Sequence, residues 1–204
     1  MNRLQIINKT LAKLGQDPVN ALNAPEKRLK TALTFFDGVR DELMESYPWN
    51  FCTARAEIYP AAVEDESGRK IYLKPAYGYK YQYRLPKDFL RLLDCAELNY
   101  SWCGSEEYPV IEGCFLLADA AGPLHIRYCR SEINELKWPP LFVNAFCAKL
   151  AYELCPNVEQ SKADRAMLFQ DFAQAVAQAK RVNAMQNPSY ALPPTDFELG
   201  RYGV

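Results

Sequence analysis

The chain has 204 residues, of which 49% are hydrophobic and 24% charged, and its formal net charge is -1. A chain of this size and composition buries a core without a metal or disulfides. Because the charges are balanced and no run of like charges exceeds Glu64–Asp65–Glu66, the sequence argues against tight sequence-independent binding to nucleic acid.

The seven cysteines show no C-x-x-C spacing and their number is odd. This indicates reduced thiols of a protein made in a cytoplasm, several of them buried as small hydrophobic groups. The N-terminus lacks the apolar core of a signal peptide, and no stretch approaches the length of a membrane span.

Two helices are predicted before Pro48. The first carries an apolar stripe at spacings of three and four from Leu4 to Leu14, with Asn2 as a cap and Gly15 at its end. The segment Asn23 to Glu26 predicts a capping box for the second helix, with Asn23 as the cap. The apolar stripe of this helix consists of Leu29, Leu33, Phe36, Val39 and Leu43.

The segment from about Trp49 to Arg130 changes to a period of two, with Gly and Pro between short runs, and predicts several strands joined by turns. Tyr77, Tyr79, Tyr81 and Tyr83 alternate with polar residues or glycine, which predicts one strand with four phenol rings on one face. Further strands are predicted at residues 89–98, 110–112, 115–118 and 124–128.

Helical spacing returns after Pro139-Pro140, with apolar residues on two sides, which predicts a buried helix. A break at Cys155-Pro156-Asn157 separates it from a long helix predicted from about Val158 to Met185. The apolar stripe of that helix is predicted to be Phe169, Phe172, Val176 and Ala179. The remaining residues are rich in proline and aromatics and predict an extended tail.

The order of elements predicts an α+β fold with one domain over residues 1–185. Its helical bundle is formed by residues 1–48 and 138–185, a small antiparallel β sub-domain is inserted at about 49–137, and residues 186–204 form the extended C-terminal tail.

Catalytic chemistry has little support in the sequence. The one histidine, His125, lies in a strand-like segment, and the favoured interpretation is a surface or interface residue. No nucleophile elbow, zinc-ligand spacing or phosphate-binding glycine motif is present. The carboxylate pairs Asp37 with Asp41 and Glu106 with Glu107 are the remaining acid–base candidates, and both are more typical of solvated surfaces.

Two groups of aromatic residues remain as candidate binding surfaces. The tyrosine strand, with Lys74, Lys80 and Arg84 nearby, is either an ordinary sheet face or a stacking platform for single-stranded nucleic acid. The tail carries Tyr190, Phe197 and Tyr202 among prolines, and we expect these three residues to bind a partner in extended form.

Five segments stand out in order along the chain. They are residues 11–22, Pro48-Trp49-Asn50-Phe51, residues 83–91, Ile126-Arg127-Tyr128 and residues 138–142. By their order and spacing, these segments resemble the tail tubular protein A family, the head-to-tail adaptors of short-tailed bacteriophages.

The resemblance implies a structural virion protein rather than an enzyme, without cofactor or metal. Twelve copies are expected to form a ring between the portal protein and a tail nozzle of the tail tubular protein B type, with DNA passing through the centre. A virion-carried cell-wall or polysaccharide hydrolase with a carboxylate pair is the alternative function.

Overall fold

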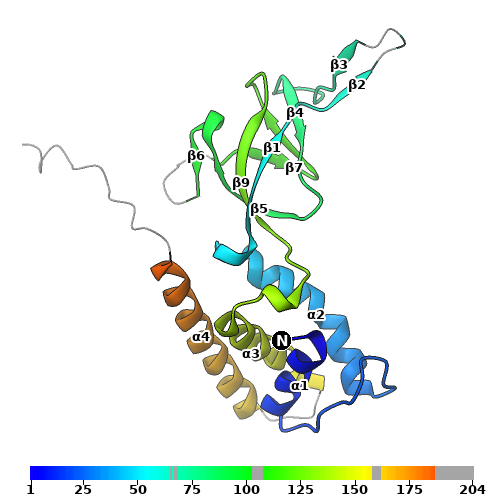
Figure 1. Ribbon diagram of the computed structural model, residues 1–204, viewed down its shortest axis with the longest axis vertical. Helices are drawn as coiled ribbons and strands as arrows, with labels where there is room; N and C mark the ends of the chain where they lie inside the picture. Colours follow the sequence, from blue (N-terminus) through cyan, green and yellow to red (C-terminus); the bar gives the residue numbers. More distant parts are fainter. Residues whose placement is uncertain (65, 67–68, 103–107, 158–161, 187–204) are drawn as a thin grey trace, which may run out of the picture.

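The structure is a computed structural model that describes residues 1–64, 66, 69–102, 108–157 and 162–186 (Figure 1). Its α-helices are α1 (Arg3–Lys13), α2 (Lys27–Glu45), α3 (Pro140–Leu154) and α4 (Lys162–Met185). Its strands are β1 (Thr53–Ile58), β2 (Ala62–Glu64), β3 (Lys70–Tyr72), β4 (Tyr81–Arg84), β5 (Phe89–Cys95), β6 (Tyr100–Ser101), β7 (Val110–Glu112), β8 (Phe115–Ala118) and β9 (Leu124–Arg130). Helices and antiparallel sheets occupy separate parts of the molecule, which confirms the α+β class.

Helix α1 begins and ends where the sequence predicts. The Asn2 side chain accepts a hydrogen bond from the backbone of Gln5, and the Gln5 side chain accepts one from the backbone of Asn2, so two free N–H groups are satisfied. After the helix, Gly15 has a φ of +64°, a left-handed conformation that favours glycine.

The predicted capping box at Asn23 is wrong. Helix α2 begins at Lys27, its N-cap is Glu26, and no side chain caps it. Pro25 favours an extended conformation for the residue before it, so the helix starts only after the proline. The carboxylate of Glu26 instead accepts a hydrogen bond from the Nε of Arg28 at 2.6 Å.

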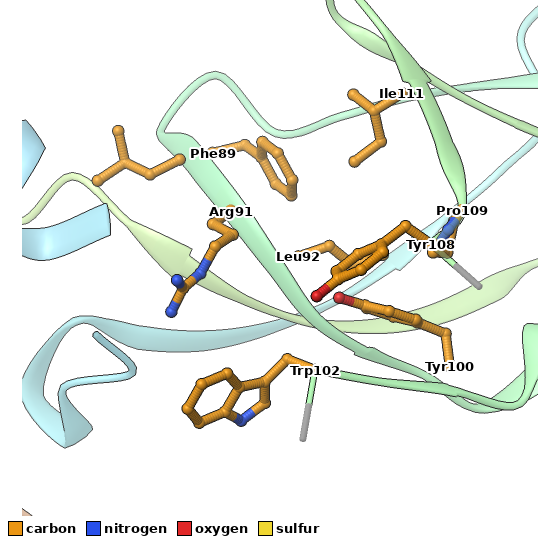
Figure 2. A pocket seen from close by; sticks show the side chains of 9 residues that line it. Phe89, Arg91, Leu92, Tyr100, Trp102, Tyr108, Pro109 and Ile111 are labelled. Carbon is orange, nitrogen blue, oxygen red and sulfur yellow. The ribbon is translucent and has the colours of Figure 1, made fainter. Parts of the chain in front are cut away.

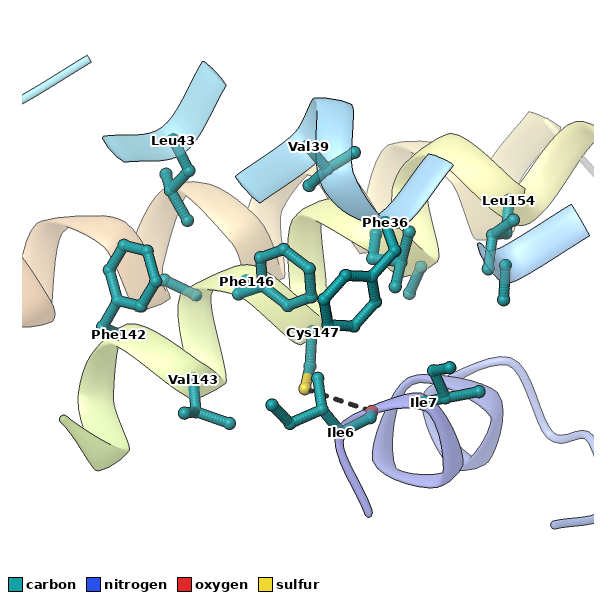
Figure 3. Packing of buried hydrophobic residues seen from close by; sticks show 14 of the residues in the cluster. Ile6, Ile7, Phe36, Val39, Leu43, Phe142, Val143, Phe146, Cys147 and Leu154 are labelled. Carbon is teal, nitrogen blue, oxygen red and sulfur yellow. Dashed lines mark hydrogen bonds between the residues drawn. The ribbon is translucent and has the colours of Figure 1, made fainter. Parts of the chain in front are cut away.

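Helix α3 lies among the other three helices and has buried residues on several sides, as predicted (Figure 3). Phe146 is fully buried, and its ring lies 4.8 Å from that of Phe36 on α2 and 5.1 Å from that of Trp138. On the side of α1, the Cys147 thiol lies 3.6 Å from the carbonyl oxygen of Ile6. Residues from both ends of the described chain therefore share one hydrophobic core.

The predicted stripe of α4 is corrected at one position. Leu168 is buried in the helical core, whereas Phe169 is 52% exposed and its ring contacts that of Tyr152. Phe172, Val176 and Ala179 pack on the core as predicted. A helix buries residues at spacings of three and four. Leu168 lies four residues before Phe172 and Phe169 lies three before it, so both positions fit this spacing.

Two sheets pack face to face above the helices. One has the strand order β1-β9-β5-β6 and the other β4-β8-β7, and all neighbouring strands are antiparallel. Tyr83 and Leu116 from the second sheet share a core with Leu92, Ile126 and residues near them from the first. The β1 and β4 edges are joined by a bridge between Pro60 and Tyr83, so β6 and β7 lie at the opposite edge.

The predicted tyrosine strand is wrong in its first half. Only β4 from Tyr81 is extended, because residues before it form bends and Gly78 has a φ of +90°. Tyr77 is 89% exposed, whereas Tyr83 is fully buried and donates hydrogen bonds to the carbonyl groups of Ala120 and Gly122. The four phenol rings therefore do not share one face.

The other strand predictions agree with the structure within a few residues. Residues 110–112 and 115–118 are strands with the predicted bounds, and β9 extends two residues beyond the predicted 124–128. The predicted strand at 89–98 ends at Cys95, where a 3-10 helix, Ala96–Leu98, follows. Strands β1, β2, β3 and β6 were not individually predicted.

The end of α4 is attached beside the start of β1. The backbone N–H of Asn50 donates to the Oδ1 of Asn183 at 2.9 Å, and the Nδ2 of Asn50 donates to the Asn183 carbonyl oxygen at 3.2 Å. Asn183 itself donates to the carbonyl oxygen of Pro48 at 3.3 Å. These bonds fix the end of α4 beside the start of β1.

The fully buried Phe146 of α3 and the half-exposed Phe169 of α4 differ enough in burial to test this packing. We expect Phe146→Ala to lower the free energy of unfolding by about 3–5 kcal/mol, because it leaves a cavity among packed rings. Phe169→Ala is the matched control, with an expected loss below about 1 kcal/mol. Urea denaturation of both variants provides the measurement, and equal losses would contradict the register assigned to α4.

Candidate functional site

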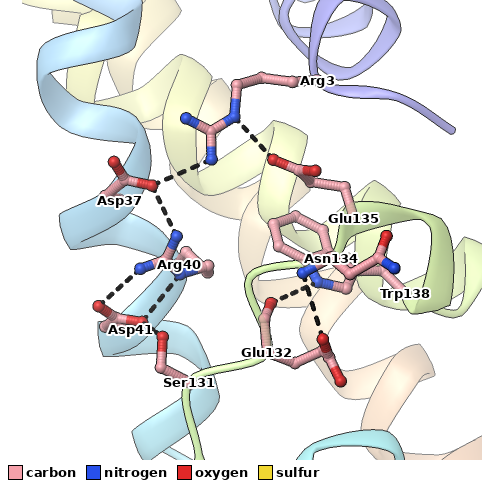
Figure 4. Close-up of polar contacts among 9 residues, drawn as sticks. All are labelled: Arg3, Asp37, Arg40, Asp41, Ser131, Glu132, Asn134, Glu135 and Trp138. Carbon is pink, nitrogen blue, oxygen red and sulfur yellow. Dashed lines mark hydrogen bonds and ion pairs between the residues drawn. The ribbon is translucent and has the colours of Figure 1, made fainter. Parts of the chain in front are cut away.

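The carboxylates Asp37 and Asp41 lie in a polar network that connects α2 to the segment after β9 (Figure 4). The Arg40 side chain, only 8% exposed, pairs with Asp37 at 2.6 Å and with Asp41 at 2.9 Å. Asp41 also accepts a hydrogen bond from the Ser131 hydroxyl at 2.6 Å, and Asp37 pairs with Arg3 at 3.2 Å.

This network makes Asp41 unsuitable as a general acid. Burial opposes its ionisation, but the hydrogen bonds from Arg40 and Ser131 outweigh burial and lower the pKa of Asp41. A glycosidase acid needs the opposite shift, toward a raised pKa. The geometry therefore assigns Asp41 to holding Ser131, just after β9, on α2, and Asp37 to joining α2 to Arg3 of α1. The second candidate pair, Glu106 and Glu107, lies outside the described residues.

His125 lies on the surface of β9 and pairs with Glu97 of the 3-10 helix Ala96–Leu98. Its ring Nδ1 lies 2.5 Å from the Glu97 Oε1, its backbone N–H donates to the Oε2 at 2.9 Å, and its side chain is 63% exposed. The hydrogen bond to Glu97 raises the pKa of His125. Burial opposes ionisation of Glu97, but the bonds from His125 outweigh it and lower the pKa of Glu97 to about 2.

The stacking platform for nucleic acid, which was the alternative to an ordinary sheet face, is not assembled by the described tyrosines. Tyr83 is in the sheet core, where burial raises the pKa of its hydroxyl, and Tyr81 is half-buried with its ring 5.9 Å from that of Tyr72. Base stacking needs exposed ring faces along one groove. Tyr77 alone of the four alternating tyrosines offers a largely exposed ring, and Lys74, Lys80 and Arg84 are exposed as well.

The structure brings together a pocket that the sequence reasoning missed. It has a volume of about 330 Å³ and lies at the β6–β7 edge of the two sheets, and Figure 2 shows its lining side chains. The lining residues are Phe89, Leu90, Arg91, Leu92, Tyr100, Trp102, Tyr108, Pro109 and Ile111. We call this cavity the edge pocket. Its rings include the Tyr100–Tyr108 pair, whose centroids are 5.6 Å apart.

Arg91 supplies the charge of the edge pocket. Its guanidinium lies over the Trp102 ring at 5.4 Å, and Figure 2 shows both side chains at one end of the pocket, away from Ile111. The buried Nε and Nη2 atoms of Arg91 have no hydrogen-bond acceptor among the described residues. Both atoms are sealed from solvent, so an occupant of the pocket meets the guanidinium chiefly as a positive charge, which favours a carboxylate.

Cys129, which lies opposite Arg91 in the register of β5 and β9, interacts with Cys52. A hydrogen bond from the Cys52 thiol and, against the effect of burial, the guanidinium of Arg91 lower the pKa of Cys129. The same contact raises the pKa of Cys52. All six described cysteines are free thiols and five of them are buried, which agrees with the sequence prediction, while Cys103 lies outside the described residues.

The hairpin formed by β2 and β3 is a second surface that the sequence did not single out. It projects beyond the two packed sheets (Figure 1). Val63 and Ile71 are directly opposite each other in its register and are 54% and 56% exposed. Leu73, two residues after Ile71 and 38% exposed, continues the same face. We call Val63, Ile71 and Leu73 the arm face.

The predicted partner-binding residues Tyr190, Phe197 and Tyr202 lie outside the described residues.

Within the described part of the chain, no group of three or more His, Cys, Asp or Glu side chains can hold a metal ion. No helix in that same part is long and apolar enough to cross a membrane. No family model matches the sequence, and no curated protein matches it.

The ion pair between His125 and Glu97 can be tested directly by titrating the histidine. Because the pKa of His125 is raised, we expect its NMR titration midpoint above about 6.5, and we expect Glu97→Gln to return it toward that value. Glu57→Gln is the control, with a smaller decrease, since Glu57 contributes only through charge at longer range. As the one histidine in the chain, His125 gives a single resolved signal.

The same ion pair stabilises the fold only within a range of pH. Its stabilising effect through His125 is present below about pH 6.5 and is lost as the pH rises through the raised pKa of His125. Its effect through Glu97 is present above about pH 4.5 and is lost as the pH falls toward 2. A midpoint that does not move in Glu97→Gln would show that the ion pair does not form in solution.

Proposed function

We propose that the chain is a structural subunit of a head-to-tail adaptor of a short-tailed bacteriophage. In this proposal, the helices from both chain ends form a bundle, and the β sub-domain of about residues 49–137 is an insertion in one adaptor domain. Twelve copies form a ring between the portal protein and the tail nozzle in the virion, and DNA passes through its centre. The order of the sequence segments that resemble the tail tubular protein A family supports this proposal.

The arm face is the structural observation that carries the proposal. A two-stranded hairpin is marginally stable by itself, and strands of three residues contribute few ladder bonds. Exposing Val63, Ile71 and Leu73 on such a projection is unfavourable in water, whereas burying them against another chain is favourable. A subunit whose function is to join other proteins accounts for this arrangement.

The charge of the chain is compatible with a DNA conduit. Its 24 Lys and Arg residues are balanced by 25 Asp and Glu residues. Strong binding to phosphates would slow the passage of DNA, because each neutralised phosphate adds to the affinity. A near-neutral subunit avoids this obstacle.

The polar contacts support a structural function over the hydrolase alternative. The one described candidate pair, Asp37 with Asp41, shares the Arg40 guanidinium, and Asp37 also pairs with Arg3. The lowered pKa of Asp41 opposes proton donation. No observation on the described residues favours a carboxylate pair facing a cleft, so we do not propose that function.

The arm face is tested by a double substitution. We expect Val63→Asp with Ile71→Asp to reduce incorporation into complexes with the portal protein of the same genome by about tenfold or more, because two charges would be buried in the contact. Lys70→Gln, on the opposite face of the same hairpin, is the matched control and is expected to incorporate normally. Co-sedimentation with the portal, quantified by subunit per portal, provides the measurement.

Both substituted side chains are exposed, so the fold is expected to be retained, and circular dichroism of each variant checks this. Normal incorporation of the double variant would remove the arm face from the proposed contact.

A further inference from the structure

The edge pocket combines two features that together define the chemistry of an occupant. Aromatic rings of Tyr100, Trp102 and Tyr108 line it, and the positively charged Arg91 guanidinium lies at one end, over the Trp102 ring. Aromatic-lined grooves bind proline-rich segments in extended form, and a guanidinium pairs with a carboxylate. The pocket therefore suits a peptide with prolines followed closely by an acidic residue.

The chain itself contains such a segment. Residues 187–204 lie outside the described part and include Leu192-Pro193-Pro194-Thr195-Asp196-Phe197-Glu198. Adjacent prolines favour the polyproline II conformation, so little conformational entropy is lost when they bind. Asp196 and Glu198 follow within a few residues and supply carboxylates that can pair with the Arg91 guanidinium.

The start of this segment lies near enough to the edge pocket for docking within one chain. Asn183 is hydrogen-bonded to Asn50, three residues before β1. Thr53 of β1 and Arg91 of β5 are both paired with Cys129 of β9, so they are roughly 10 Å apart across that strand. The path from Asn183 to Arg91 is therefore on the order of 20 Å.

The length of the segment matches this path. From Gln186 to Pro194 an extended polyproline chain spans roughly 25 Å, at about 3.1 Å per residue. A tether of this length gives an effective concentration of about millimolar, so a weak contact suffices for high occupancy. A separate partner would have to bind much more tightly to compete at cellular concentrations.

We propose that residues 187–204 dock in the edge pocket of their own chain, with Pro193 and Pro194 against the aromatic rings and an acidic residue on Arg91. This inference concerns a single chain, so it does not depend on the adaptor proposal. Its consequence is that a binding partner of Tyr190, Phe197 or Tyr202 has to draw the segment out of the pocket first.

Photo-cross-linking of the full chain tests this proposal. With Phe197 replaced by benzoylphenylalanine, irradiation is expected to give a cross-link within the monomer to peptides that contain Tyr100, Trp102, Tyr108 or Ile111. We expect Arg91→Gln to lower the yield about fivefold or more, whereas Arg55→Gln, at an exposed arginine of β1, leaves it unchanged. Mass spectrometry locates the linked residues, and circular dichroism verifies the fold of each variant.

A second measurement avoids the cross-linker. In the full chain, Pro193→Ala with Pro194→Ala is expected to shift the NMR signals of the Ile111 methyl and the Trp102 indole N–H, and Pro188→Ala is not. Cross-links that lie elsewhere or join only two chains, or pocket signals that do not respond to the double substitution, would overturn the proposal. Loss of portal incorporation would affect the adaptor proposal alone.

Discussion

The burial of α3 is the constraint on which the rest of the structure depends. This helix contacts α1, α2 and α4, and its own residues Phe142, Phe146 and Cys147 are buried. Since its neighbours come from both ends of the described chain, the residues between α2 and α3 must leave and return at nearly the same place. The antiparallel pairing of β1 with β9, from Thr53 opposite Cys129 to Ile58 opposite Leu124, satisfies this requirement.

Polar contacts at the point where β1 and β9 meet the helices then fix the position of the sheets relative to the helices. Arg40 and Asp41 on α2 hold Ser131 just after β9, while Asn183 at the end of α4 holds Asn50 just before β1. Charged and amide groups suit this position, because their hydrogen bonds are directional and specify one arrangement. The arm face and the edge pocket are thereby presented at opposite edges of a fixed pair of sheets.

Helices were easier to predict from this sequence than strands. A stripe such as Leu29, Phe36 and Leu43 repeats over several turns, so a single error does not hide the pattern. The boundary at Asn23 failed because Pro25 overrides a capping motif, and Phe169 was chosen over Leu168 because two adjacent apolar residues fit the same stripe. The run of alternating tyrosines failed because Gly78 interrupts the extended backbone, which alternation alone does not reveal.

The edge pocket was not predictable, since it depends on which strands are neighbours. Arg91, Tyr100 and Ile111 come from three strands, two of them only two or three residues long, and periodicity in such short strands carries little information. The one sequence signal was a density of aromatic residues between Phe89 and Tyr108, which favours a sheet but does not place the rings together.

The central claim of the account is the proposal that this chain is a subunit that assembles with other chains. Electron microscopy of the full chain mixed with the portal protein of the same genome tests it most directly. The account predicts an additional ring with twelve-fold symmetry beneath the portal. A mixture in which the portal carries no additional ring would contradict it.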